Sequence, residues 1–229
     1  MLHGYLPSLL DGARLTLAVA GLSLLIAVLL GLLAATARLS GSAVLRRIAV
    51  VYTTVIRGVP DLVLMLLIFF GGQIAVNALA PRLGIDGYID IDPFVAGVAT
   101  LGFIFGAYLG ETFRGAIIAI PPGQAEAARA YGFGRWRLFR RIVLPQMVRL
   151  ALPGFTNNWL VLVKSTALVS VIGLNDMMQK AGQAAGATRE PFTFYLAVGA
   201  LYLVITTLSV VALRALEKRY SLGVKVVAF

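Results

Sequence analysis

The chain of 229 residues is 59% hydrophobic and only 13% charged, with a mean hydropathy of +0.90. A soluble domain is nearer half apolar and carries about 25% charged residues, so this composition is typical of a chain that has lipid as its solvent. The absence of cysteine excludes disulfides and thiolate metal sites, and the one histidine, His3, is interpreted as incidental rather than as a ligand or general base.

The net charge of +10 is compatible with nucleic-acid binding, but the basic residues lie between long apolar runs instead of forming one patch. Five runs approach or exceed the ~20 residues that a helix needs to cross ~30 Å of hydrocarbon. We therefore predict an all-α integral membrane protein with one transmembrane domain over residues 1–229 and no nucleic-acid partner. The predicted spans are residues 15–37, 59–80, 94–120, 155–174 and 192–213.

The positions of the basic residues predict the orientation. With the N-terminus outside, the inner segments carry fourteen basic residues and the outer segments carry four. Because short inner loops are enriched in Lys and Arg, this count favours an outer N-terminus and a cytoplasmic C-terminus. The inner residues are Arg38, Arg46, Arg47, Arg57, Arg129, Arg135, Arg137, Arg140, Arg141, Arg149, Arg214, Lys218, Arg219 and Lys225, and the outer ones are Arg14, Arg82, Lys180 and Arg189.

The segment 121–153, the longest between the predicted spans, has the pattern of two short helices. Residues 124–130 favour helix, Gly132 predicts a sharp turn, and residues 135–144 resume a helical period that Pro145 is expected to end. In the second helix, apolar and basic side chains occupy opposite halves, which is typical of a helix on a membrane surface or a partner protein. The apolar residues are Trp136, Leu138, Phe139, Ile142 and Val143, and the basic ones are Arg137, Arg140 and Arg141.

This segment resembles the EAA loop of ABC importer permeases. Glu126-Ala127-Ala128, then Gly132, then Ile142, Leu144 and Pro145 reproduce seven fixed positions over twenty residues. Four further runs resemble the polar amino acid subfamily: residues 57–60, 111–115, 122–124 and 164–168. Residues 57–64 and 89–93 resemble the Q-type subunit of permeases for histidine, lysine, arginine and ornithine. Many members carry an apolar residue in place of Asp61 and a shorter loop before the third span, so this departure favours the basic amino acid or opine branch.

The resemblance implies a type I ABC importer permease fold with cytoplasmic coupling helices, in a bacterial inner membrane. It implies a transporter subunit that is not an enzyme and holds no cofactor, since ATP and Mg would bind a partner ATPase dimer. The other implied partners are a second homologous permease subunit, or a second copy of this chain, and a substrate-binding protein outside the membrane. The motif assigns ATPase coupling to Glu126, Ala127, Ala128, Gly132, Ile142, Leu144 and Pro145.

Two groups of residues are candidates for the substrate pathway. Gly102, Gly106 and Gly110 form a smooth stripe that would let another helix or a solute approach the backbone. Arg114 extends this stripe, and Glu111 lies about 100° around the helix from Gly110. Ionisable groups inside a span must pair or face a cavity. Glu111 and Arg114 form either a structural ion pair or a lining that meets the amino and carboxylate groups of the substrate, and both interpretations stay open.

The second candidate group lies in the fourth predicted span, where Asn157, Asn158 and Lys164 interrupt the apolar run. Such breaks can mark a discontinuous helix around a transport site, and inter-helix hydrogen bonds are the alternative. Asp61, beside Pro60, is expected to cap the first turn of the second span. The candidate pathway therefore consists of Gly106, Gly110, Glu111, Arg114, Asn157, Asn158 and Lys164.

Other functional classes have weaker support. Residues 163–166 lack the glycines of a phosphate-binding loop, so this chain is not expected to hydrolyse ATP. No metal-ligand cluster or nucleophile–base arrangement is recognisable, which disfavours an intramembrane hydrolase. A self-contained secondary transporter is the alternative of a different class, disfavoured by five spans, no internal repeat and a patterned inner loop.

Overall fold

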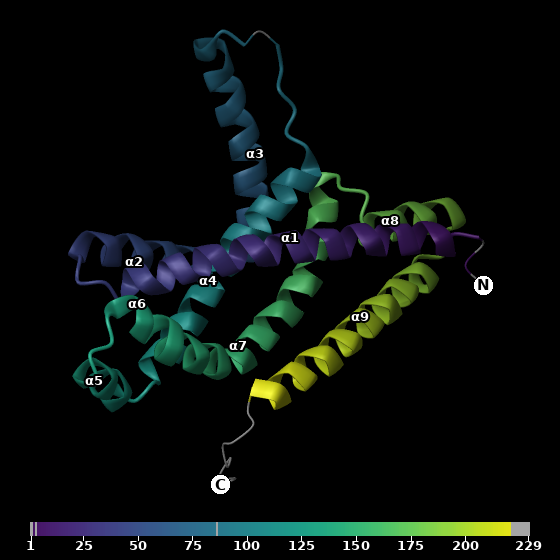
Figure 1. Ribbon diagram of the computed structural model, residues 1–229. Coiled ribbons are helices and arrows are strands. Elements are labelled where there is room, and N and C mark those ends of the chain that lie inside the picture. The colour runs from purple at the N-terminus through teal and green to yellow at the C-terminus, as the bar shows by residue number, and fades with distance from the viewer. Residues whose placement is uncertain (1, 3, 86, 221–229) are drawn as a thin grey trace.

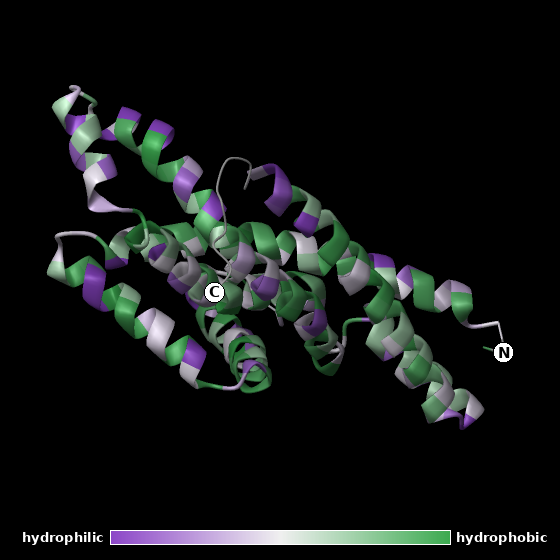
Figure 2. Cartoon of the chain, turned by 90° about the horizontal axis from the view of Figure 1, so that it is seen from below, coloured by the Kyte–Doolittle hydropathy of each residue, from purple (hydrophilic) through white to green (hydrophobic). Residues whose placement is uncertain are grey.

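Five long apolar helical segments dominate the computed structural model, which describes residues 2, 4–85 and 87–220 (Figure 1). Apolar residues predominate along these segments (Figure 2), and the described residues contain no strand. The prediction of an all-helical fold with five candidate spans is confirmed. The spans are α1 (Leu6–Arg38), α3 (Asp61–Leu79) with η1 (Ala80–Leu83), α4 (Pro93–Ile118), the run Arg135–Ile172, and α9 (Pro191–Tyr220).

Several helices extend beyond the apolar runs from which they were predicted. The first begins at Leu6, with Pro7 in its first turn, although its apolar run begins near residue 15. The last continues to Tyr220, although its apolar run ends near residue 213. Hydropathy locates the lipid-facing part of a helix, whereas hydrogen bonding and capping set where the helix ends.

The segment before the second predicted span is a helix rather than a simple connection. α2 (Ala43–Gly58) begins at Ser42, whose hydroxyl accepts a hydrogen bond from the amide of Leu45, and packs against α1 and α4. Gly58 ends α2, Val59 is extended, and Pro60 precedes α3. The chain therefore changes direction at residues 58–60: α2 runs beside α1, whereas α3 points away from both (Figure 1).

The expectation that Pro145 ends the second loop helix is wrong. The short helix α6 (Arg135–Leu138) continues through the π-helical turn η2 (Phe139–Val143) into α7 (Leu144–Ser165), so Pro145 lies in a helical first turn. A proline lacks an amide hydrogen and its ring crowds the preceding helical turn. The wider π turn directly before Pro145 relieves that conflict. The chain then ends the span with the 3₁₀ turn η3 (Thr166–Ile172).

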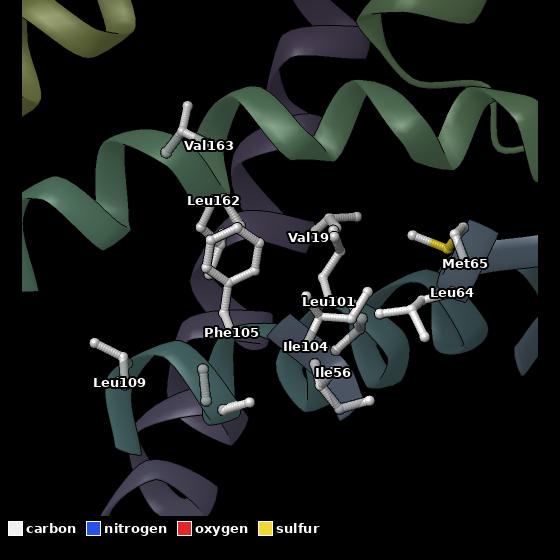
Figure 3. Close-up of a cluster of buried hydrophobic side chains, with 14 of the residues drawn as sticks. Val19, Ile56, Leu64, Met65, Leu101, Ile104, Phe105, Leu109, Leu162 and Val163 are labelled. Atoms are coloured by element: carbon white, nitrogen blue, oxygen red, sulfur yellow. The ribbon is translucent and has the colours of Figure 1, made fainter. Parts of the chain in front are cut away.

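The core is centred on α1 and α4, which make the most extensive helix–helix contact. Figure 3 shows side chains from five helices meeting there, among them Val19, Ile56, Met65, Phe105 and Leu162. Phe105 and Leu162 are 1% exposed and Val19 and Met65 are fully buried. Burial of such side chains fixes how the five helices pack, and thereby positions the polar groups between them.

A second, smaller cluster joins α8 (Met177–Thr188) to the beginning of α1 and to α9. Gly12 makes this contact possible, because a Cβ at that position would lie 2.7 Å from the Cα of Met177. The remaining short helix, α5 (Pro122–Ala130), lies with α6 at the other end of α1 (Figure 1).

Candidate functional site

The segment that joins α4 to α7 turns sharply at Gly132. Gly132 has φ of +77°, a left-handed conformation that favours glycine. Its amide donates to the carbonyl of Arg129 over 2.9 Å, and the amide of Phe133 donates to Ala128 over 3.0 Å. These two bonds form a Schellman motif, which satisfies the last carbonyls of α5. The expected reversal between two helices is confirmed at this residue.

The surface of the α5–α6 segment combines exposed aromatic rings with positive charge. Tyr131 is 86% exposed and Trp136 is 71% exposed. Ala128 and Leu138 are buried inside the segment, whereas Glu126 and Ala127 are exposed. Exposed aromatic rings flanked by arginines are characteristic of protein interfaces. Trp136 belongs to the apolar half that was expected to meet a membrane surface or a partner protein, and it is exposed in this single chain.

The other motif residues of this segment lie where it joins the membrane helices. Ile142 and Leu144 are partly buried, and Pro145 is exposed. Leu144 packs against the core that α1, α4 and α7 share. α6 continues through η2 into α7 without a gap, so a displacement of α6 would be transmitted to the spanning helix.

Glu111 belongs to a polar cluster that joins α4 to α1 and α2 through Arg38. Its Oε2 accepts hydrogen bonds from Nε and Nη2 of Arg114 at 3.0 and 2.8 Å, as expected from their spacing on one helix. Its Oε1 accepts from Nη1 of Arg38, the last residue of α1, at 2.6 Å. Arg38 also donates to Thr53 of α2 at 2.8 Å. The structural ion pair between Glu111 and Arg114 is therefore present, and Arg38 joins it as a second cation that the sequence did not indicate.

A polar cavity of about 430 Å³ lies beside this cluster, at the break between α2 and α3. The Arg57 guanidinium lies 5.7 Å from the ring centroid of Tyr108, which is within cation–π range. The residues that line the cavity are Arg38, Thr53, Thr54, Arg57, Gly58, Tyr108 and Glu111.

The glycine stripe of α4 packs against α1. A Cβ at Gly102 would lie 2.6 Å from Ile26, and one at Gly110 would lie 3.0 Å from the Cβ of Ala34. Gly106 meets Leu30 of α1 in the same way. Either another helix or a solute was expected to approach this stripe, and in the structure it is the helix α1. The pathway proposed below therefore omits Gly106 and Gly110.

The polar residues of α7 divide between two roles. Asn158 donates to Thr112 of α4 at 3.0 Å and to the carbonyl of Gly154 at 2.8 Å, so it makes the inter-helix hydrogen bond foreseen as an alternative. Asn157 is exposed. Lys164 is also exposed and, with Thr206 and Arg214 of α9, lines a cavity of about 390 Å³. The structure does not bring Lys164 into the cavity at the α2–α3 break.

Asp176 is a buried carboxyl group that the sequence did not single out. One oxygen caps α8 by accepting from the amide of Gln179 at 2.9 Å, and the other oxygen is buried without a partner. Burial raises the pKa of this carboxyl group to about 6. The Asp before a helical run is a readable cap signal, but its burial by α1 and α9 depends on tertiary packing. In the described part of the chain, no three His, Cys, Asp or Glu residues gather as a metal site.

Five spanning helices, a basic helix–turn–helix segment continuous with one of them, and a polar cavity at a helix break describe a membrane-embedded permease subunit. The chain belongs to the family described as binding-protein-dependent transport system inner membrane component, which matches residues 27–222. It is a multi-pass permease subunit of an inner-membrane transport system.

Relatives with curated names cover almost the whole chain. The sequence is 55% identical over 225 residues to the histidine/lysine/arginine/ornithine transport system permease protein HisQ of Salmonella typhimurium, covering 98% of each chain. It is 41% identical to the octopine transport system permease protein OccQ of Rhizobium meliloti, covering 97% of this chain and 94% of that one. A crystal structure of an amino acid ABC transporter with histidines matches with a TM-score of 0.80 at 34% identity, covering 94% and 95% of the two chains.

Proposed function

We propose that this chain forms half of the membrane passage of an ATP-driven importer for histidine, lysine, arginine and ornithine. The observation that carries the proposal is the 55% identity to HisQ permeases across 98% of both chains. Opines are the alternative cargo, because the octopine and nopaline permeases are 41–42% identical over nearly the same length.

The α5–α6 segment is the proposed seat of the ATPase. Its reversal at Gly132 is fixed by backbone hydrogen bonds, so the segment can move as one body. Tyr131 and Trp136 offer exposed rings to a groove on the partner, and Glu126, which is exposed, can meet a basic group there. Closure of the ATPase dimer would push on α6, and the helical continuity through η2 would carry that push into α7. ATP and Mg would bind the ATPase, and no cofactor is assigned to this chain.

The assembly would contain this chain, a second homologous permease or a second copy of this one, two ATPase subunits and a soluble substrate-binding protein. Fourteen basic residues on one side and four on the other support an N-terminus outside the cytoplasm and a C-terminus inside it. One of the fourteen, Lys225, lies outside the described residues. In this orientation the α5–α6 segment faces the cytoplasm, where the ATPase would dock.

The proposed pathway passes the cavity at the α2–α3 break. Around it, Thr54, Arg57 and Gly58 are exposed on the surface of this single chain. Exposed charge and unpaired backbone are costly in lipid, so this face would meet water or a partner chain. Asn157 and Lys164 lie on an exposed face of α7 and are proposed to line the passage farther along. Glu111 and Arg114 would border it as a fixed ion pair.

The decisive experiment is purification of the tagged chain from its native membrane with identification and counting of the co-purified proteins. We expect two ATPase subunits for each two permease chains, and arginine uptake once the complex and its binding protein are placed in liposomes. Recovery of the chain alone, folded and able to transport, would overturn the proposal and favour a secondary transporter. Opine uptake without uptake of basic amino acids would shift the cargo to the alternative.

A further inference from the structure

α2 has an exposed apolar face that forms a groove with α4. The groove has a volume of about 500 Å³, and two of the residues that line it, Val51 and Val55, are 60% and 52% exposed. A second apolar groove, of about 410 Å³, runs between α2 and α1. The two grooves share three lining residues, Ile48, Tyr52 and Phe103. They therefore lie next to each other on one surface of the protein.

Tyr52 of α2 and Phe103 of α4 hold this surface in place. The Tyr52 hydroxyl donates a hydrogen bond to the carbonyl of Phe103 over 2.6 Å, and the centroids of the two rings are 4.9 Å apart. Gly106, about one turn further along α4, leaves room for the tyrosine, because a Cβ there would lie 2.7 Å from its hydroxyl. The shape of the grooves is therefore set by two helices that are fixed to each other.

The groove between α2 and α4 runs from one end of the membrane helices toward their middle. α2 follows α1 after the connection 39–42, so its first residues lie at the same end of α1 as the α5–α6 segment (Figure 1). Arg47 lines the groove near this end, and Val55 lies eight residues, or about 12 Å, further along α2. Phe103 lies near the middle of α4. The groove thus has the depth of one leaflet, which is half of a hydrocarbon core of about 30 Å.

Arg47 makes the outer end of this groove cationic. In the part of the chain that the structure describes, no carboxylate lies within 4 Å of Arg47 or of its exposed neighbour Arg46. α2 itself contains no acidic residue, so pairing of this face with the same face of a second copy would bring like charges together. A basic group above an apolar groove is complementary to a lipid that has a negative headgroup and apolar chains.

We propose that the two grooves beside α2 bind an anionic phospholipid of the inner leaflet. Arg47 binds the phosphate, and one acyl chain lies along Val51 and Val55. The neighbouring groove between α2 and α1 accepts the second acyl chain. The lipid covers the apolar side of α2, whose polar side borders the cavity at the α2–α3 break. This inference uses the orientation of the proposed function, which places the beginning of α2 at the cytoplasmic surface, and it is independent of the cargo.

The test is photolabelling of the protein, purified with the subunits that accompany it, in bilayers that contain a lipid with a photoreactive acyl chain. Phosphatidylglycerol is the anionic probe, and phosphatidylcholine with the same chains is the neutral one. Phosphatidylglycerol should label α2 about fivefold more than phosphatidylcholine, the factor expected for one arginine beside an anionic lipid surface. Arg47→Gln should remove this preference, whereas Arg219→Gln, which removes the same charge at the end of α9, should keep it. Equal labelling by both lipids would overturn the inference.

The apolar part of the site is tested without a change of charge. Val51→Trp fills the groove and should reduce the labelling of α2 by both lipids, whereas Leu208→Trp, at a position that is 65% exposed on α9, should not. The chain has no cysteine, so Val51→Cys reports whether a second copy covers this face instead. A disulfide between two chains after mild oxidation, with no lipid label on α2, would overturn the inference and identify the second copy as the occupant.

Arginine uptake by the same complexes separates this inference from the proposed function. A complex that imports arginine, but in which the anionic lipid shows no preference for α2, overturns only the lipid site. A complex that shows the preference and its loss in Arg47→Gln, but imports no amino acid, overturns the proposed function and supports the lipid site.

Discussion

Arg38 and Glu111 are joined by a 2.6 Å hydrogen bond although 73 residues separate them in sequence. Arg38 closes the C-terminal end of α1, and Glu111 lies in the last third of α4. Their side chains are 22% and 18% exposed, so the pair is largely removed from solvent. Because Glu111 also binds Arg114, two arginines share one carboxylate as their counter-charge, and the Arg38–Glu111 bond ties α1 to α4 at one end.

Replacement of Glu111 by Gln is expected to destabilise the protein rather than to alter substrate recognition. The change would leave two largely buried guanidinium groups without a counter-charge, at a cost of about 3 kcal/mol. Unfolding in detergent should therefore occur at a lower temperature. The variant that remains folded should keep the wild-type concentration for half-maximal uptake, because neither oxygen of Glu111 is free for substrate. Asp11→Asn, which breaks an exposed pair, should change stability by less than ~1 kcal/mol. A raised half-maximal concentration for Glu111→Gln with unchanged stability would contradict this prediction.

Gly106→Ala should also destabilise the protein, through steric overlap between α4 and α1. The added Cβ would lie 2.7 Å from the Cβ of Leu30, which is fixed to the backbone of α1, and 2.7 Å from the Tyr52 hydroxyl. Overpacking of this kind costs about 1–3 kcal/mol. Gly115→Ala is the matched control in the same helix, because nothing lies within 4 Å of its added Cβ. Thermal unfolding in detergent should separate the two variants, and equal unfolding temperatures would show that the α1–α4 contact is looser than described.

The sequence was most informative where the signal is local. Gly132 could be placed at a reversal because a left-handed residue favours glycine, and the five spans could be found because hydropathy is averaged over many residues. The partner of Glu111 could be predicted only within its own helix, as Arg114, because i,i+3 spacing is visible in a sequence. Arg38 comes from a different helix, and nothing in the sequence indicates which helices become neighbours.

The same distinction explains the helix boundaries that were wrong. α2 is only sixteen residues long and contains charged residues, so it gave no span signal, although it packs along α1 and α4. Pro145 is a strong local stop signal, but the π turn before it allows the helix to continue. The cavity at the α2–α3 break depends on the packing of α2 against α1 and α4 and on the position of Tyr108. Each residue that lines the cavity can be read in the sequence, but the sequence does not indicate that these residues lie together.

Asp176 is expected to make stability depend on pH. Its pKa is about 6 in the folded protein and 3.8 as the ordinary value, so the folded state binds the proton more tightly than the unfolded state. The resulting stabilisation is complete below about pH 4 and is lost as the pH rises through about 6, with an upper limit of about 3 kcal/mol. Asp176→Asn keeps a side-chain oxygen for the cap and removes the charge. It should therefore unfold at a higher temperature than wild type at pH 7.5 and at a similar temperature at pH 4.5. Equal differences at both pH values would contradict this assignment.

Gly132 provides the sharpest test of coupling, because Gly134 lies two residues away in an ordinary conformation. Neither residue has an atom within 4 Å of an added Cβ, so alanine at either position causes no steric clash. Gly132 has φ of +77°, whereas Gly134 has φ of −64°. Alanine should therefore cost about 1–2 kcal/mol at Gly132 and little at Gly134, and the cost should appear as distortion of the α5–α6 turn.

The expected result is a protein that inserts and assembles normally but couples poorly. Gly132→Ala should reduce uptake for each ATP hydrolysed, Gly132→Glu should abolish it because a charged side chain is also added beside the exposed Tyr131, and Gly134→Ala should resemble wild type. The measurement is uptake and ATPase activity of the same liposome-bound complexes, with the amount of ATPase retained on the membrane as the internal standard. Normal uptake by Gly132→Glu would mean that this turn does not transmit the force of ATP binding, and the docking surface would then have to be sought elsewhere on the cytoplasmic face.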